Sequence, residues 1–155
     1  MLRECILTTV SISIIFSVFA QNPPTTFPME FKVTTYAIND SVYTGIPELN
    51  DIVVSLYQDK SGTIHMLNEW RNVDTMSFGK ISNLSERQYE QTAETYGATE
   101  YNFVWHYAND YNEHKGLADV QLTKIFKENN QVDFTANIYV RGRAYLISLA
   151  GYMEQ

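Results

Sequence analysis

The chain has 155 residues, of which 45% are hydrophobic and 14% aromatic. This is enough for one globular domain and leaves little room for two. Its 11 basic and 18 acidic residues give a formal charge of −7. The acidic balance argues against nucleic acid, and against an anionic membrane surface, as the main partner, because both require a basic face.

The first twenty residues have the pattern of a secretory signal peptide. Arg3 supplies a charged start, an apolar stretch runs from Ile6 to Phe19, and Val18-Phe19-Ala20 is the small-x-small pattern that signal peptidase recognises. The apolar stretch is shorter than the roughly 20 residues of a membrane span, and serine and threonine dilute it. We therefore expect cleavage after Ala20 and a secreted or periplasmic protein with no membrane span.

Cleavage would remove Cys5, the one cysteine of the chain. The exported protein would then have no disulfide, no cysteine nucleophile and no thiolate zinc site. Glycosylation sequons begin at Asn39 and Asn83, and they matter only if the source glycosylates its secreted proteins. The lack of disulfides suits a bacterial envelope protein at least as well, so both sources stay open.

Residues 21–28 are rich in proline and are interpreted as a linker, which leaves one β-domain over residues 29–155. Apolar and polar residues alternate through most of this domain, which is the period of a half-buried strand. The clearest case is 132–141, where every second residue from Val132 to Val140 is apolar. The predicted strands are 31–38, 52–57, 64–70, 76–80, 101–107, 118–123, 132–141 and 145–149.

The segments between these strands have turn chemistry. Residues 59–62 have aspartate first and glycine last, as in a type I turn, and residues 128–131 form a second polar turn. Segment 86–96 is ambiguous. Its start fits a helix capping box, but its tyrosines and threonines equally suit a strand that faces solvent. We keep both interpretations, with at most one short helix in the domain.

These elements predict an all-β domain of about eight short antiparallel strands, with a long polar turn over 109–116 at one rim. Two architectures fit the pattern: a sandwich, or a small and partly open barrel. The sequence does not separate them, because it does not determine the order of the strands in space.

The aromatic residues are the best indication of a binding site. The chain has 11 tyrosines and 2 tryptophans, which is more than a core of this size satisfies easily, because each buried hydroxyl needs a hydrogen-bond partner. Some should line a surface or cavity that binds a ligand, although packing at sheet edges is the alternative. Four candidates lie at strand ends or beside the long turn: Trp70, Trp105, Tyr107 and Tyr111.

A second candidate is a metal site built from His106, Asp110 and His114, which are spaced four residues apart. This spacing would align the three side chains on a helix. The predicted strand over 101–107 instead separates His106 from the other two, which lie in the turn. The oxygen-rich run 109–113 contains ligands that calcium accepts, but not the residue order of a known calcium loop.

The chain contains no nucleophile elbow, phosphate-binding glycine loop or dinucleotide fingerprint. The leading hypothesis is therefore a non-catalytic, exported binding module without a cofactor, whose partner is a small molecule, a glycan or a protein. Two alternatives are a metal-assisted enzyme that uses the histidine and aspartate set, and a structural protein that assembles through its sheet edges.

Overall fold

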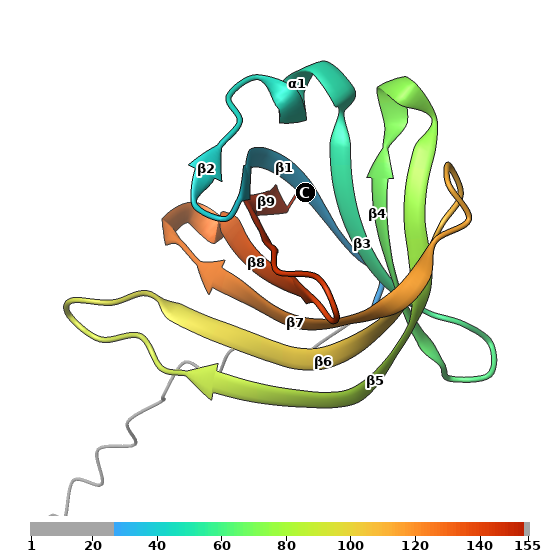
Figure 1. Ribbon diagram of the computed structural model, residues 1–155. Coiled ribbons are helices and arrows are strands. Elements are labelled where there is room, and N and C mark those ends of the chain that lie inside the picture. Colours follow the sequence, from blue (N-terminus) through green and yellow to red (C-terminus); the bar gives the residue numbers. More distant parts are fainter. Residues whose placement is uncertain (1–26, 154–155) are drawn as a thin grey trace, which may run out of the picture.

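The computed structural model describes residues 27–153, which form one antiparallel sheet closed into a barrel (Figure 1). The predicted signal peptide and most of the predicted linker lie outside the described residues. The strands of the barrel are β1 (Met29–Ile38), β3 (Ile52–Gln58), β4 (Ile64–Trp70), β5 (Thr75–Tyr89), β6 (Gly97–Asn109), β7 (Lys115–Phe126), β8 (Val132–Val140) and β9 (Leu146–Met153).

The strands follow one another around the barrel in chain order, and β9 returns to pair with β1. The two-residue β2 (Ser41–Val42) adds to the outer end of β1, and the short helix α1 (Ile46–Asn50) leads into β3. Short 3-10 turns occupy Arg71–Val73 and Glu128–Asn130. The all-β prediction is confirmed, and the barrel is closed rather than partly open.

The alternation in the sequence determines which side chains fill the barrel. On β6, Tyr101, Phe103, Trp105 and Tyr107 point inward and are buried, while the residues between them are half-buried on the outer face. The predicted alternation of 132–141 is also observed, with Phe134, Ala136, Ile138 and Val140 buried. Closing a sheet in this way buries one face of the strands around a single core, although residues 83–89 of β5 remain exposed.

Closure requires the strands to coil and to approach each other closely. Two glycines permit this, because a Cβ at Gly79 would lie 1.8 Å from the backbone oxygen of His106, and one at Gly151 would lie 1.9 Å from that of Lys32. Register shifts interrupt β1 between Val33 and Thr35 and β5 between Ser82 and Ser85. Such bulges increase the local twist and bend the strand.

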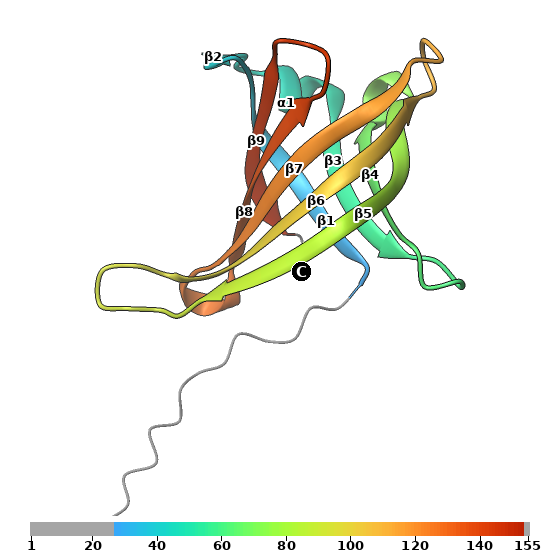
Figure 2. The ribbon, with the colours of Figure 1, turned by 60° about the horizontal axis from the view of Figure 1, so that its bottom comes forward.

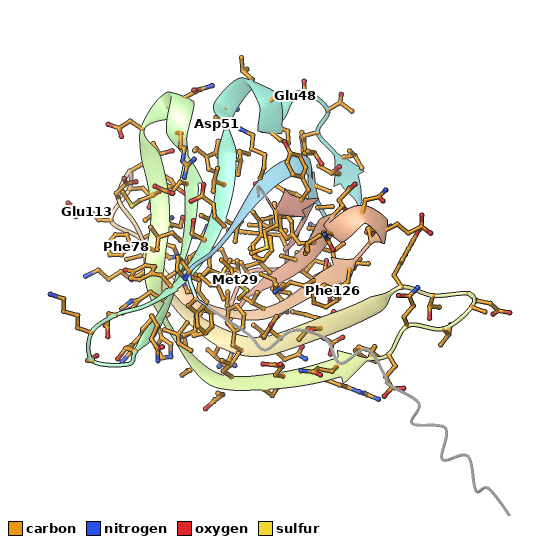
Figure 3. The ribbon with its side chains drawn as sticks, turned by 180° about the vertical axis from the view of Figure 1, so that it is seen from behind. Met29, Glu48, Asp51, Phe78, Glu113 and Phe126 are labelled. Atoms are coloured by element: carbon orange, nitrogen blue, oxygen red, sulfur yellow. The ribbon has the colours of Figure 1, made fainter. Side chains whose placement is uncertain are left out.

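The two ends of the barrel differ, and Figure 2 displays them above and below. One end, here called the mouth, carries the segments 39–51, 71–74, 110–114 and 141–145, including β2 and α1. The other end carries the turns 59–63, 90–96 and 127–131. Figure 3 places Glu48 on α1 and Glu113 on the loop between β6 and β7, and both side chains are exposed.

The end opposite the mouth is filled with side chains. Phe31 and Phe134 stack there with ring centroids 4.7 Å apart, and neither they nor Met29 is more than 1% exposed. Lys124 is 7% exposed, and its Nζ lies 5.4 Å from the centroid of the Phe126 ring. Burial lowers the pKa of this lysine, and the charge of nearby Glu86 opposes that change.

The helix considered for segment 86–96 does not form. Residues 86–89 are the last part of β5, paired with β6 from Glu86–Tyr101 to Tyr89–Ala98, and a turn follows. Hydrogen bonds between β5 and β6 satisfy the backbone N–H groups that a helix capping box would have satisfied within the segment. The sequence also did not predict α1, whose first turn contains the buried Pro47. Among residues 27–153, no helix has the length and apolar character needed to cross a membrane.

Candidate functional site

Two adjoining cavities lie inside the mouth of the barrel. The larger has a volume of about 370 Å³ and the smaller about 110 Å³. Both are lined by Asn68, Ser77, Tyr111 and Ile147, so they share a wall and are treated as one site. These residues come from β4, β5, the loop between β6 and β7, and β9. The combined site is at the small end of the size range of ligand pockets.

The strand ladders explain why these side chains meet. Asn68 of β4 lies directly across from Ser77 of β5, and Ser77 in turn pairs with Asn109 of β6. Residues that face each other across a ladder point to the same side of the sheet. Because the sheet closes on itself, that side is the interior, and β9 brings Ile147 to the same space.

The four aromatic residues expected to bind a ligand all line this site. Trp70 lines the larger cavity, Trp105 and Tyr107 line the smaller one, and Tyr111 lines both. Trp70 packs edge-to-face on Tyr36, with ring centroids 5.5 Å apart and an interplanar angle of 84°. The rings of Trp105 and Tyr107 are also 5.5 Å apart, tilted by 47°. Flat aromatic surfaces therefore form two walls of the site.

Sequence reasoning missed several other lining residues, namely Tyr36, Asn68, Ser77, Tyr145 and Ile147. A signal for one of them was available. In β4 the inward positions are Ile64, Met66, Asn68 and Trp70, and Asn68 is the polar residue on that otherwise apolar face. The other lining residues could not be predicted, because the sequence does not determine which strands become neighbours.

A chain of polar contacts runs along one wall of the site. Ser77 Oγ donates to Asn109 Oδ1 at 2.7 Å, and Asn109 Nδ2 donates to Asn112 Oδ1 at 3.1 Å. Asn112 Oδ1 also accepts from the backbone N–H of His114 at 3.0 Å. These bonds hold the turn between β6 and β7 against the barrel, and they use the hydroxyl hydrogen of Ser77.

The site disfavours negative charge on its tyrosines. Burial raises the pKa of the Tyr36 hydroxyl, and the nearby hydroxyls of Tyr111, Tyr145 and Tyr43 raise it further. Burial also raises the pKa of Tyr107, against the opposing effect of Arg143. A phenolate would be poorly solvated in this space, so these hydroxyls stay protonated at neutral pH.

Arg143 carries positive charge at the rim of the site. Arg143, an exposed residue of the loop between β8 and β9, lies with its Nη2 3.1 Å from His114 Nε2. The His114 ring is 5.9 Å from that of Tyr107. The other arginine of this hairpin, Arg141, bonds Asp119 on the outer face through two contacts, one of them at 2.9 Å.

The structure does not bring the predicted metal ligands together. His106 points to the outer face, where its Nε2 lies 2.8 Å from Ser82 Oγ, and Asp110 Oδ1 accepts from the backbone N–H of Met76. His114 instead lies at the mouth beside Arg143. Within residues 27–153, no group of three or more histidine, cysteine, aspartate or glutamate side chains is arranged to hold a metal ion.

Comparisons with known proteins add no family to these observations. No protein-family model matches the chain, and neither a curated protein nor a solved structure gives a match. The geometry of the mouth is therefore the basis for proposing a function.

Proposed function

We propose that this protein binds a small molecule inside the mouth of its barrel and that it is a binding module rather than a catalyst. One observation carries the proposal. The mouth of a closed eight-stranded barrel contains two adjoining cavities, and each of the four aromatic side chains singled out from the sequence lines at least one of them. Barrels of eight strands are wide enough to hold one small ligand.

The opposite end of the barrel supports a site with one entrance. Stacked Phe31 and Phe134, together with Met29, fill that end. A ligand would enter from the mouth and rest on the packed core. The composition of the cavity, aromatic walls with a few polar groups, is that of small-molecule sites in general.

The assembly alternative would use the sheet edge that β5 leaves open. β5 pairs with β4 over Thr75–Lys80 and with β6 over Ser77–Tyr89, so residues 81–89 lie at an edge of the sheet beside β6. Such an edge can pair with another chain, but the cavities at the mouth favour a small ligand. As part of the same proposal, export through a signal peptide cleaved after Ala20 would place the binding protein outside the cytoplasm.

A fluorescent probe tests the proposal. N-phenyl-1-naphthylamine is uncharged, aromatic and emits strongly when it leaves water. Titration into the folded protein, with the probe excited directly, should give saturable binding with one site per chain. The variant Thr75→Trp places a large ring in the larger cavity, which Thr75 lines, and should weaken binding by about tenfold or more.

A matched variant controls for the added tryptophan. Thr135→Trp makes the same change on the exposed outer face of β8 and should bind the probe like the unmodified protein. The proposal is wrong if the unmodified protein does not bind the probe. It is also wrong if a folded Thr75→Trp variant binds as tightly as the Thr135→Trp variant.

A further inference from the structure

One polar atom in the site has no protein partner. Asn68 is 9% exposed, it lines both cavities, and its Oδ1 accepts no hydrogen bond from any residue in 27–153. Leaving such an acceptor unpaired is costly, and native proteins rarely do so. Because Asn68 lines both cavities, its unpaired amide oxygen is a polar group that a bound molecule could satisfy.

Two of the donors near Asn68 are already used within the protein. The hydroxyl of Ser77, directly across the ladder from Asn68, donates to Asn109 Oδ1 at 2.7 Å. The indole Nε1 of Trp105 donates to the backbone oxygen of Met66 at 3.2 Å. Neither group donates to Asn68 Oδ1, so a molecule in the cavity can supply the missing donor.

The charges around the site indicate which kind of donor fits. Among residues 27–153, no aspartate or glutamate lines either cavity, so an ammonium group would have no carboxylate there to pair with after losing its water. Negative charge is also disfavoured in the interior, since burial raises the pKa of both Tyr36 and Tyr107. The cation that lines the smaller cavity, Arg143, is an exposed residue of the loop between β8 and β9. The inner part of the site suits an uncharged group.

The aromatic side chains that line the cavities indicate the shape of the ligand. The Tyr36–Trp70 pair and the Trp105–Tyr107 pair present flat rings from β1, β4 and β6. Aromatic side chains of this kind favour a planar ring, which packs against them face-on or edge-on.

We infer that the ligand is an uncharged, planar aromatic molecule carrying one N–H or O–H group that donates to Asn68 Oδ1. This inference rests on the proposed function and specifies the chemistry of the same site. The aromatic walls provide contact area for the ring, and Asn68 selects molecules that have a donor. An analogue without the donor would leave the amide oxygen buried and unpaired.

Two probes of nearly equal shape test the donor. N-phenyl-1-naphthylamine has an N–H between its two ring systems, whereas 1-phenoxynaphthalene has an ether oxygen there. We expect the amine to bind the unmodified protein about tenfold more tightly or better, with the ether measured by displacement of the amine. In Asn68→Leu, which keeps the size of the side chain and removes the amide, the ratio should fall to about one.

A matched variant locates the effect. Asn137→Leu makes the same change on the outer face of β8, where Asn137 borders a shallow depression, and it should keep the preference of the unmodified protein. Equal binding of the two probes to the unmodified protein overturns the inference and leaves the proposed function standing. That comparison needs no variant, so it holds even if Asn68→Leu fails to fold. Absence of binding by either probe overturns the proposed function itself.

A second pair of probes tests whether the ligand is uncharged. 1-Naphthalenemethanol and 1-naphthylmethylamine have the same ring and a donor at the same distance from it, but the amine is an ammonium ion at neutral pH. The alcohol should bind more tightly by about tenfold or more, because the site offers no carboxylate. Tighter binding of the ammonium ion would contradict the inference that the ligand is uncharged.

Discussion

Replacing Phe134 by alanine tests whether the barrel is packed at the end opposite the mouth. The ring is 1% exposed and stacks on Phe31 at 4.7 Å. Removing a buried phenylalanine costs the transfer free energy of its atoms and leaves a cavity, which together destabilise a protein by about 3–5 kcal/mol. For a domain of this size that loss corresponds to a fall in Tm of about 10–15 °C.

The free energy of unfolding can be measured by urea titration followed by tryptophan fluorescence, with a thermal melt for the Tm. Tyr139→Ala is the control, since Tyr139 is on the outer face of the same strand and 51% exposed. The control should change the free energy of unfolding by less than about 1 kcal/mol.

Phe134→Ala should leave ligand binding at the mouth unchanged. Its affinity for N-phenyl-1-naphthylamine should match that of the unmodified protein at a temperature where both are folded, because Phe134 lines neither cavity at the mouth. A loss of less than about 1 kcal/mol would refute the packed end. Loss of probe binding in the folded variant would refute the separation between this end and the site.

Three further predictions concern pH, backbone approach and export. Tyrosines in the unfolded chain lose their protons near pH 10, while burial raises the pKa of Tyr36 and Tyr107. The unfolded state then binds fewer protons than the folded state, so the free energy of unfolding should be constant below about pH 9 and fall above about pH 10 in urea titrations. A rise above about pH 10 would contradict the burial of these hydroxyls. Gly79→Ala should destabilise the barrel by about 2 kcal/mol or more, since the new Cβ would lie 1.8 Å from the His106 backbone oxygen, and an unchanged Tm would contradict that close approach. Expression of the full chain in a secreting host should release a protein that begins at Gln21, as measured by intact mass, and a secreted product that retains residues 1–20 would contradict cleavage after Ala20.

The sequence predicted the strands well where one face of a strand is apolar. Strands β3, β4 and β8 lie within one residue of their expected bounds. Prediction was poorer where a strand is long and largely exposed, as in β5, whose 15 residues include the segment considered for a helix. Much of β5 has no buried face, so its sequence lacks the alternation that identified the other strands.

The residues of the candidate site were likewise predicted only in part. Residue type and position at strand ends selected Trp70, Trp105, Tyr107 and Tyr111, all of which line the mouth. Spacing also suggested His106, Asp110 and His114, which the strand and the turn direct to different places. A spacing of four residues has a meaning on a helix, and it has none across a strand and the turn that follows it.

Alternation along most of the strands therefore predicted, without any tertiary information, that the protein is all-β and which face of those strands is buried. Only the tertiary structure decided that β9 returns to β1, and hence that the buried face encloses an interior. Strand order depends on contacts between residues more than a hundred positions apart, such as Phe31 and Met153, and no local pattern specifies them. The unpaired oxygen of Asn68 on β4 also depends on the tertiary structure. Its neighbour Ser77 on β5 donates its hydroxyl hydrogen to Asn109 on β6 instead.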